Sequence, residues 1–175
     1  MRKVEVEPYQ EKWAAMFLDE AKTLREIFTE ELLEIHHIGS TSVPGLLAKP
    51  VIDIMPVIKD ITSVEQHNVE MKQMGYNPKG ENGIPQRRYF EKGGDRRTHH
   101  VHFYQAGSPE IKRHLAFRDY LRTHPQDKQQ YGELKKTLAK QFPYDIAAYI
   151  HGKEQLVREI ESRALIWHAR EHENR

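Results

Sequence analysis

The chain has 175 residues and a nearly balanced charge, with 27 lysines and arginines against 26 acidic residues, and it contains no cysteine. The lack of cysteine excludes disulfides, thiolate catalysis and cysteine-based zinc sites. A net charge of +1 does not indicate a nucleic-acid or membrane partner. The first residues lack the apolar core of a signal peptide and no run approaches the length of a membrane span, so we expect a cytoplasmic protein.

The first part of the chain alternates between helical and strand-like segments. Apolar residues at helical spacing predict an amphipathic helix over residues 12–33. Residues 62–75 also have a helical pattern, which ends at a glycine. Strands are predicted where β-branched and aromatic residues are dense; they cover residues 33–38, 51–58, 86–92 and 98–105, with a hairpin turn at residues 93–97.

From residue 108 onward the pattern is helical, and Ser108 followed by Pro109 is a typical helix start. Breaks near residues 123–127 and 141–145 divide this part into three helices. Strands and helices in separate parts of the sequence predict an α+β protein. The expected boundaries are a single domain over residues 1–170, with a sheet-containing part at about 1–107 and a helical part at about 108–170, and a polar tail at 171–175.

A Gly-Ser turn, Gly39-Ser40, directly follows one predicted strand, and the next strand carries an acid, Asp53, among apolar neighbours. A glycine lets a ligand approach the backbone closely. The Ser40 hydroxyl and the N–H groups of Thr41 and Ser42 can face a phosphate. A carboxylate beside bound phosphates is typical of a site for a divalent cation such as Mg²⁺. The plain alternative is an ordinary turn, and an acid that accepts hydrogen bonds from loop N–H groups.

The stretch HIGSTSVPGLLAKPVIDI, residues 37–54, resembles the signature of the GrpB family. This family is a group within the nucleotidyltransferase-like superfamily, and related domains are fused to dephospho-CoA kinases. The resemblance continues in RRYFEKGGDRRTHHVHFYQAGSPEIKRHLAFRDYLRTHP, in YGELKKTLA and in YDIAAYIHGKEQLV, so it covers most of the chain. It implies a nucleotidyltransferase-like mixed β-sheet with flanking helices, followed by a C-terminal helical part.

The resemblance also implies roles for particular residues. In the superfamily pattern a Gly-Ser turn holds the nucleotide phosphates, and two carboxylates, two residues apart on the next strand, bind metal with a third from a later strand. Gly39 and Ser40 match the turn, and Asp53 matches one of the paired acids. The positions two before and two after Asp53 are Val51 and Met55. The second acid of the pair is therefore missing.

Two histidines offer replacements for the missing acids. His100 and His102 lie two apart on a predicted strand, so they share a face, at about the place where the superfamily brings its later acid. With Asp53 they would form a mixed oxygen and nitrogen metal site, and nitrogen ligands favour Mn²⁺, Fe²⁺, Ni²⁺ or Zn²⁺ over Mg²⁺. We expect a divalent metal, Mg²⁺ or Mn²⁺, with Asp53 and His102 as the catalytic residues, since a histidine is also a general base. The alternative is two polar side chains that bind backbone carbonyls.

In addition to the Gly39–Ser42 turn, three basic residues are candidates for binding phosphate. Lys49 enters the Asp53 strand, and Arg88 lies on a predicted strand with the guanidinium geometry that suits phosphate oxygens. Lys153 lies in the last predicted helix and would reach a triphosphate. The alternatives are that Lys49 neutralises Asp53, that Arg88 belongs to a solvated face, and that Lys153 makes contacts along an exposed helix.

These observations leave three functions open. The first is a metal-dependent nucleotidyltransferase, which moves a nucleoside monophosphate from a nucleoside triphosphate to an unknown acceptor. The second is a non-catalytic nucleotide-binding or regulatory module that kept the fold and lost turnover with the second acid. The third is a metal-dependent hydrolase based on the histidines. Whether the protein is an enzyme stays open between these hypotheses.

Overall fold

The computed structural model describes residues 2–173, and the chain divides into two compact units. The sheet unit consists of residues 11–38 and 51–111, and the helical unit consists of residues 1–10, 39–50 and 112–175. Two segments that precede the boundary expected near residue 107 therefore belong with the C-terminal helices. The single domain over residues 1–170 stays a prediction.

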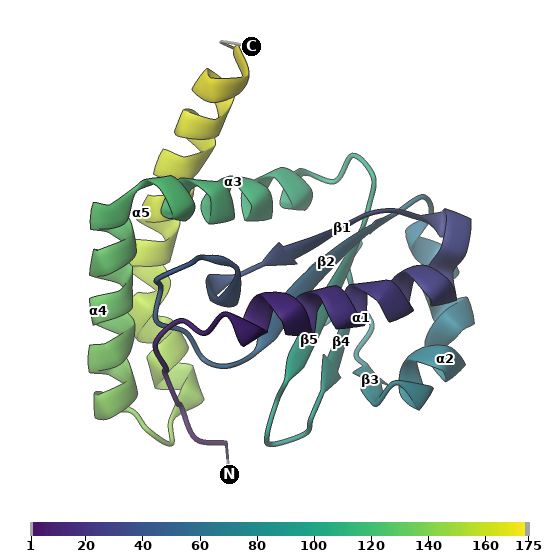
Figure 1. Cartoon of the computed structure of the whole chain (residues 1–175), viewed down its shortest axis with the longest axis horizontal. Coiled ribbons are helices and arrows are strands. Elements are labelled where there is room, and N and C mark those ends of the chain that lie inside the picture. Colours follow the sequence, from purple (N-terminus) through teal and green to yellow (C-terminus); the bar gives the residue numbers. More distant parts are fainter. Residues whose placement is uncertain (1, 174–175) are drawn as a thin grey trace. The chain divides into compact units, whose positions relative to one another are not determined.

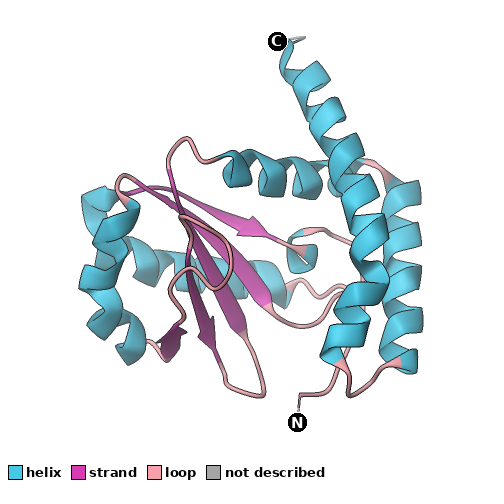
Figure 2. Ribbon diagram, turned by 180° about the vertical axis from the view of Figure 1, so that it is seen from behind, coloured by secondary structure: helices cyan, strands magenta, loops and turns pink. Residues whose placement is uncertain are grey.

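The sheet unit is built on five strands in the order β1-β2-β5-β4-β3 (Figures 1 and 2). The strands are β1 (Leu32–Ile38), β2 (Ile52–Ile58), β3 (Tyr76–Pro78), β4 (Arg88–Lys92) and β5 (His99–Gln105). Strands β2 and β5 run parallel, whereas the other three neighbouring pairs are antiparallel, so the sheet is mixed as expected. Four strands were predicted, and the three-residue strand β3 was not.

Helix α1 (Lys12–Phe28) packs in the sheet unit through its apolar side chains. The Phe28 ring lies 4.8 Å from that of Phe103 on β5, and the Phe17 ring stacks on His37 of β1. The predicted helix over residues 12–33 was wrong at its end. Thr29 has a φ of 51°, a conformation that an α-helix does not contain, so the helix stops there and β1 starts at Leu32.

Two further helical segments in the sheet unit, a 3₁₀ helix (Ile61–His67) and α2 (Asn68–Gln73), lie between β2 and β3. They correspond to the helical pattern predicted over residues 62–75. The segment ends at Gly75, whose φ of 96° and hydrogen bond to the Lys72 carbonyl oxygen are typical of a helix C-cap.

The helical unit contains α4 (Pro125–Gln141), α5 (Ile146–Glu173) and α3 (Pro109–Thr123) from its fourth residue onward. Both predicted breaks are confirmed, and the first three residues of the expected polar tail lie in α5, while the last two fall outside the described residues. The 39–50 segment contributes to the core of this unit, because Val43 and Leu46 are buried beside Leu121 and Ile160. Within the described part of the chain, no helix has both the length and the apolar character of a membrane span.

Candidate functional site

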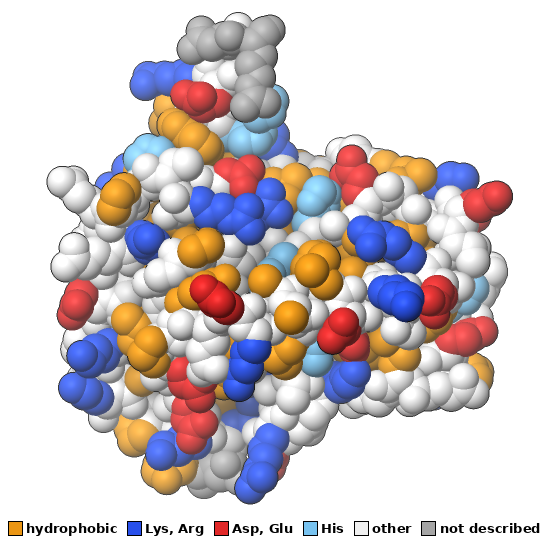
Figure 3. Space-filling model, viewed as in Figure 1, with side chains coloured by type: hydrophobic (Ala, Val, Ile, Leu, Met, Phe, Trp, Pro, Cys, Tyr) orange, Lys and Arg blue, Asp and Glu red, His pale blue; other side chains and the backbone are white. Residues whose placement is uncertain are grey.

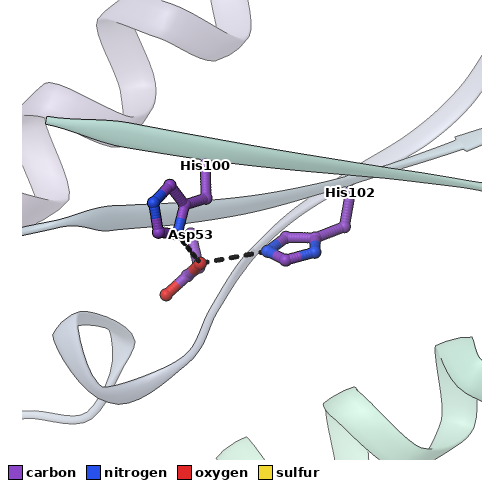
Figure 4. A group of neighbouring side chains, drawn as sticks. All are labelled: Asp53, His100 and His102. Atoms are coloured by element: carbon purple, nitrogen blue, oxygen red, sulfur yellow. Dashed lines mark hydrogen bonds and ion pairs between the residues drawn. The ribbon is translucent and has the colours of Figure 1, made fainter. Parts of the chain in front are cut away.

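The central strands of the sheet unit bring Asp53, His100 and His102 together (Figure 4). Asp53 on β2 is the direct neighbour of His100 on the parallel strand β5, and His102 lies on the same face two residues further on. One carboxylate oxygen, Oδ1 of Asp53, lies 3.0 Å from Nε2 of His102 and 3.5 Å from Nδ1 of His100. These three residues are called the Asp-His centre below.

The Asp-His centre has the donor atoms and the access that a divalent metal needs. One ligand atom from each residue lies within 4.8 Å of the other two, and the side chains are 13–27% exposed. Burial alone would raise the pKa of Asp53, but hydrogen bonds from His100 and His102 hold it well below its ordinary value, so the carboxylate is ionised. One carboxylate oxygen and two imidazole nitrogens are donor atoms that suit Mn²⁺, Fe²⁺ or Zn²⁺.

The two positions that could carry the second acid of the superfamily pattern, Val51 and Met55, are both buried and apolar. Neither side chain can take over the charge of a carboxylate. Among the described residues, the Asp-His centre is the group of three potential ligands close enough to share an ion.

Strand β4 supplies two further residues on the same face as the Asp-His centre. Tyr89 pairs with His102 and Glu91 pairs with His100 across the β4–β5 ladder. Burial, with the nearby charges of Glu91 and Asp53, raises the pKa of Tyr89 to about 12, so it stays a neutral phenol. Its hydroxyl lies 3.4 Å from a carboxylate oxygen of Glu91.

Arg88 does not join the Asp-His centre. In the β4–β5 ladder it lies opposite Phe103, on the other face of the sheet, and its guanidinium pairs with Glu65. Its neighbour Arg87 and the turn residue Arg97 lie beside the two histidines instead. The alternation of β4 explains this placement, because Arg87 stands two positions before Tyr89 and thus on the side of the centre. We therefore leave Arg88 out of the proposed site.

The predicted Gly-Ser turn belongs to the helical unit, where residues 40–42 form one turn of 3₁₀ helix. Gly39 has a φ of 72°, which favours glycine. Thr41 and Ser42 are buried, and the Ser42 hydroxyl donates a hydrogen bond to the Gly39 carbonyl oxygen. Ser42 closes the turn and Thr41 is buried, so we leave both out of the proposed phosphate site and keep Gly39 and Ser40.

A buried lysine that the sequence analysis missed contacts this turn. Lys135 on α4 is 2% exposed. Its ammonium donates hydrogen bonds to the Ser40 hydroxyl and, at 2.9 Å, to the Leu47 carbonyl oxygen, and it lies 4.4 Å from the centre of the Tyr131 ring. A lysine is rarely buried unless something pairs with its charge.

The two lysines that were predicted lie around a second tyrosine of the helical unit. The ammonium groups of Lys49 and Lys153 lie 5.1 and 5.2 Å from the centre of the Tyr149 ring. Tyr149 is fully buried, burial raises its pKa, and its hydroxyl has no hydrogen-bond partner among the described residues. The lysine-tyrosine cluster is the name used below for Lys49, Lys135, Lys153, Tyr131 and Tyr149.

The sheet and its flanking helices define the chain as a nucleotidyltransferase-like protein in fold. Its structure is similar to that of Cid1, a poly(U) polymerase solved with the UTP analogue UMPNPP, with a TM-score of 0.51 and 18% identity over 76% of this chain and 42% of that chain. At this identity the likeness concerns the fold alone.

The chain belongs to the GrpB family, whose model matches residues 3–163. It is 52% identical over 166 residues to UPF0157 protein YqkA of Bacillus subtilis, which covers 95% of this chain and 48% of that protein. The chain thus spans about half the length of this relative. Conserved protein GrpB from Enterococcus faecalis has a TM-score of 0.91 and 44% identity over 94% of this chain and 99% of that one. A dephospho-CoA kinase of Mycolicibacterium paratuberculosis, 23% identical over 189 residues, is the kind of relative that the family resemblance implied.

Proposed function

We propose that this protein is a metal-dependent nucleotidyltransferase, which moves a nucleoside monophosphate from a nucleoside triphosphate to an acceptor hydroxyl or phosphate. The observation that carries the proposal is the Asp-His centre: an ionised carboxylate and two imidazoles within 4.8 Å of one another, on the central strands of a nucleotidyltransferase-like sheet. In the reaction the acceptor oxygen would bond to the α-phosphorus, the bond to the β-phosphate would break and pyrophosphate would leave.

Within the helical unit, the lysine-tyrosine cluster and Ser40 are the residues that we propose for binding phosphate groups. Three ammonium groups offset much of the charge of a triphosphate, and charge-assisted hydrogen bonds to phosphate oxygens are among the stronger ones. The face drawn in Figure 3 carries both basic and acidic side chains.

Asp53, His100 and His102 would hold the divalent metal, whose charge stabilises the negative charge that develops on the transferred phosphate. In the metal-free centre, the hydrogen bonds from both histidines keep Asp53 ionised and thus ready to bind a cation. The acceptor hydroxyl must lose a proton. In the alternative where His102 does not bind the metal, it would be the general base, because it touches Asp53 and is 13% exposed.

A second candidate function is a nucleotide-binding module without turnover. The observation that favours it is that Val51 and Met55, the positions two before and two after Asp53, are both buried and apolar, so neither supplies a second acid. Two-metal catalysis depends on such paired carboxylates, so a protein that lost one acid can keep binding without catalysis.

The test is isothermal titration with Mn²⁺ alone, then with non-hydrolysable nucleoside triphosphates, followed by a pyrophosphate-release assay with labelled triphosphates and a panel of acceptors. Binding of both ligands with pyrophosphate release supports the transferase. Nucleotide binding without release in any acceptor pool supports the module. Metal binding without nucleotide binding would contradict both and favour a histidine-based hydrolase.

A further inference from the structure

Each imidazole of the Asp-His centre has both of its ring nitrogens engaged. His102 faces Asp53 with Nε2, while its Nδ1 lies 3.4 Å from Nη1 of Arg87. His100 faces Asp53 with Nδ1, while its Nε2 lies 3.3 Å from Nη1 of Arg97. The five side chains thus form a continuous chain in the order Arg87, His102, Asp53, His100, Arg97.

The chemistry of the two ends decides where the protons of the imidazoles lie. A guanidinium has only N–H donors and no acceptor, so the ring nitrogen that faces it must offer a lone pair. A neutral imidazole carries one N–H, which must then lie on the nitrogen that faces Asp53. The ionised carboxylate of Asp53 is an acceptor, so it satisfies both N–H groups.

Both arginines are held in these positions by other contacts. Arg87 is 7% exposed, donates to the carbonyl oxygens of Glu81 and Asn82, and lies 4.8 Å from the centre of the Tyr89 ring. Arg97 donates to the Gly94 carbonyl oxygen at 2.8 Å and to the Glu91 carboxylate at 2.5 Å. The donors that face the histidines are therefore fixed by the surrounding structure.

Around these histidines the hydrogen-bond donors and acceptors are reversed, compared with the usual surroundings of metal-binding histidines. A metal needs the lone pairs of Nδ1 of His100 and Nε2 of His102, the nitrogens that here carry the protons. A ligating histidine normally donates its outer N–H to a carboxylate or carbonyl acceptor. In this centre the outer nitrogens face the N–H groups of arginines, which cannot accept that hydrogen bond.

We propose that Arg87 and Arg97 are positioning residues that lock the metal-free centre in opposite histidine tautomers, with Nδ1–H on His100 and Nε2–H on His102, and thereby lower its affinity for metal. Metal entry moves each proton to the outer nitrogen and requires each arginine to turn away. The part of this inference that concerns metal affinity rests on the proposed function, whereas the tautomer assignment does not.

The first test reads the tautomers directly in the unmodified protein. Long-range ¹⁵N–¹H NMR spectra of the metal-free chain at pH 8, where free imidazoles are neutral, distinguish the two N–H positions. Single His100→Gln and His102→Gln variants assign the signals. We expect opposite tautomers on the two rings, and either ring in the reverse tautomer would overturn the proposal.

The second test separates hydrogen-bond polarity from charge at Arg97, which is more exposed than Arg87. Arg97→Gln and Arg97→Met both remove the charge and the contact with Glu91, but only glutamine supplies an acceptor for the outer N–H of His100. We expect Mn²⁺ alone to bind Arg97→Gln about fivefold more tightly than Arg97→Met, the effect of one net hydrogen bond. Arg97→Lys, which keeps a charged donor, should bind no more tightly than wild type.

Equal Mn²⁺ affinity of the glutamine and methionine variants would show that Arg97 affects metal binding through its charge alone. The proposed tautomer lock would then be wrong, although the metal site would remain. If neither the wild type nor any variant binds Mn²⁺, the metal site of the proposed function fails, and with it the effect on affinity. The NMR result distinguishes these cases, because it needs no metal.

Discussion

The Asp-His centre and the lysine-tyrosine cluster, each within its own unit, accommodate buried charge in different ways. In the sheet unit, an ionised carboxylate accepts hydrogen bonds from two imidazoles, and its pKa is held low by them. In the helical unit, the buried ammonium of Lys135 contacts a hydroxyl, a carbonyl oxygen and an aromatic ring. A carboxylate with imidazoles attracts a cation, whereas ammonium groups beside aromatic rings leave positive charge for an anion. The two regions therefore suit two different ligands, a metal ion and a phosphate chain.

The largest effect is expected from Asp53→Asn, which keeps the shape of the side chain and removes its charge, and so tests whether the sheet unit binds the metal. We expect affinity for Mn²⁺ alone to fall about a hundredfold or more, because removing a direct metal ligand should cost at least as much affinity as removing a residue that only hydrogen-bonds to a ligand. The measurement is isothermal titration, with circular dichroism as the check on folding. Asp19→Asn, at an exposed position of α1, is the matched control. Unchanged Mn²⁺ affinity in Asp53→Asn would mean that the acid is structural.

Lys135→Met tests the other side of the comparison. We expect affinity for a non-hydrolysable nucleoside triphosphate to fall about tenfold, since a hydrogen bond from a charged group contributes about 1.5–3 kcal/mol. Affinity for Mn²⁺ alone should stay the same, because Lys135 belongs to the helical unit. Lys136→Met, at the neighbouring exposed position, should leave both affinities unchanged. A loss of Mn²⁺ binding in Lys135→Met would show that the two regions are not independent.

Ser40→Ala tests whether a single hydroxyl of the helical unit contributes to phosphate binding. This hydroxyl contacts the Lys135 ammonium, and its removal should weaken binding of the same nucleotide analogue by about 1 kcal/mol, the scale of one net hydrogen bond. Fluorescence titration of a labelled analogue measures the change. Ser162→Ala on the exposed side of α5 is the control. Equal affinity of Ser40→Ala and wild type would move the phosphate site away from the turn.

The smallest expected effect concerns a histidine outside both regions. Its titration makes the stability of the protein depend on pH independently of the two regions. Burial, together with the nearby His172 and Lys112, lowers the pKa of His168. The unfolded chain then binds a proton at this position more readily than the folded chain, so stability is lost as the pH falls from about 6.5 through the lowered pKa.

We therefore expect His168→Gln to lose less stability than wild type between pH 7.5 and pH 5, as measured by urea unfolding. His151→Gln is the matched control, because the His151 side chain is 87% exposed. If the two variants lose stability to the same extent as wild type over this range, His168 does not contribute.

The sequence predicted most of the fold because its strong patterns are local. The dense β-branched residues of β2 and the helix start at Ser108-Pro109 depend on neighbours in the chain. The end of α1 was misplaced because Leu32 and Leu33 continue the apolar spacing of the helix, although the backbone turns at Thr29. Strand β3 was missed because it has three residues and ends at a proline.

The candidate site was harder to predict, because its partners come from distant segments. The alternation within β5 placed His100 and His102 on one face, and the structure brings them to Asp53. Lys135 was overlooked because lysine is normally exposed. A signal was present, since Lys135 lies between Tyr131 and Leu138 at positions i, i+4 and i+7 of a buried stripe.

The discontinuity of the helical unit affects the order in which the chain can fold during synthesis. The backbone N–H of Val4 donates to the carbonyl oxygen of Pro143, and Glu7 bridges to Ala48. All segments of the sheet unit have been synthesised once residue 111 is made, whereas Val4 must wait for Pro143, which follows α4. At a translation rate of about 5–20 residues per second, Val4 waits roughly 7–28 s for Pro143. Val4 therefore has no contact with Pro143 while the sheet unit forms, and the helical unit completes its contacts after the sheet unit.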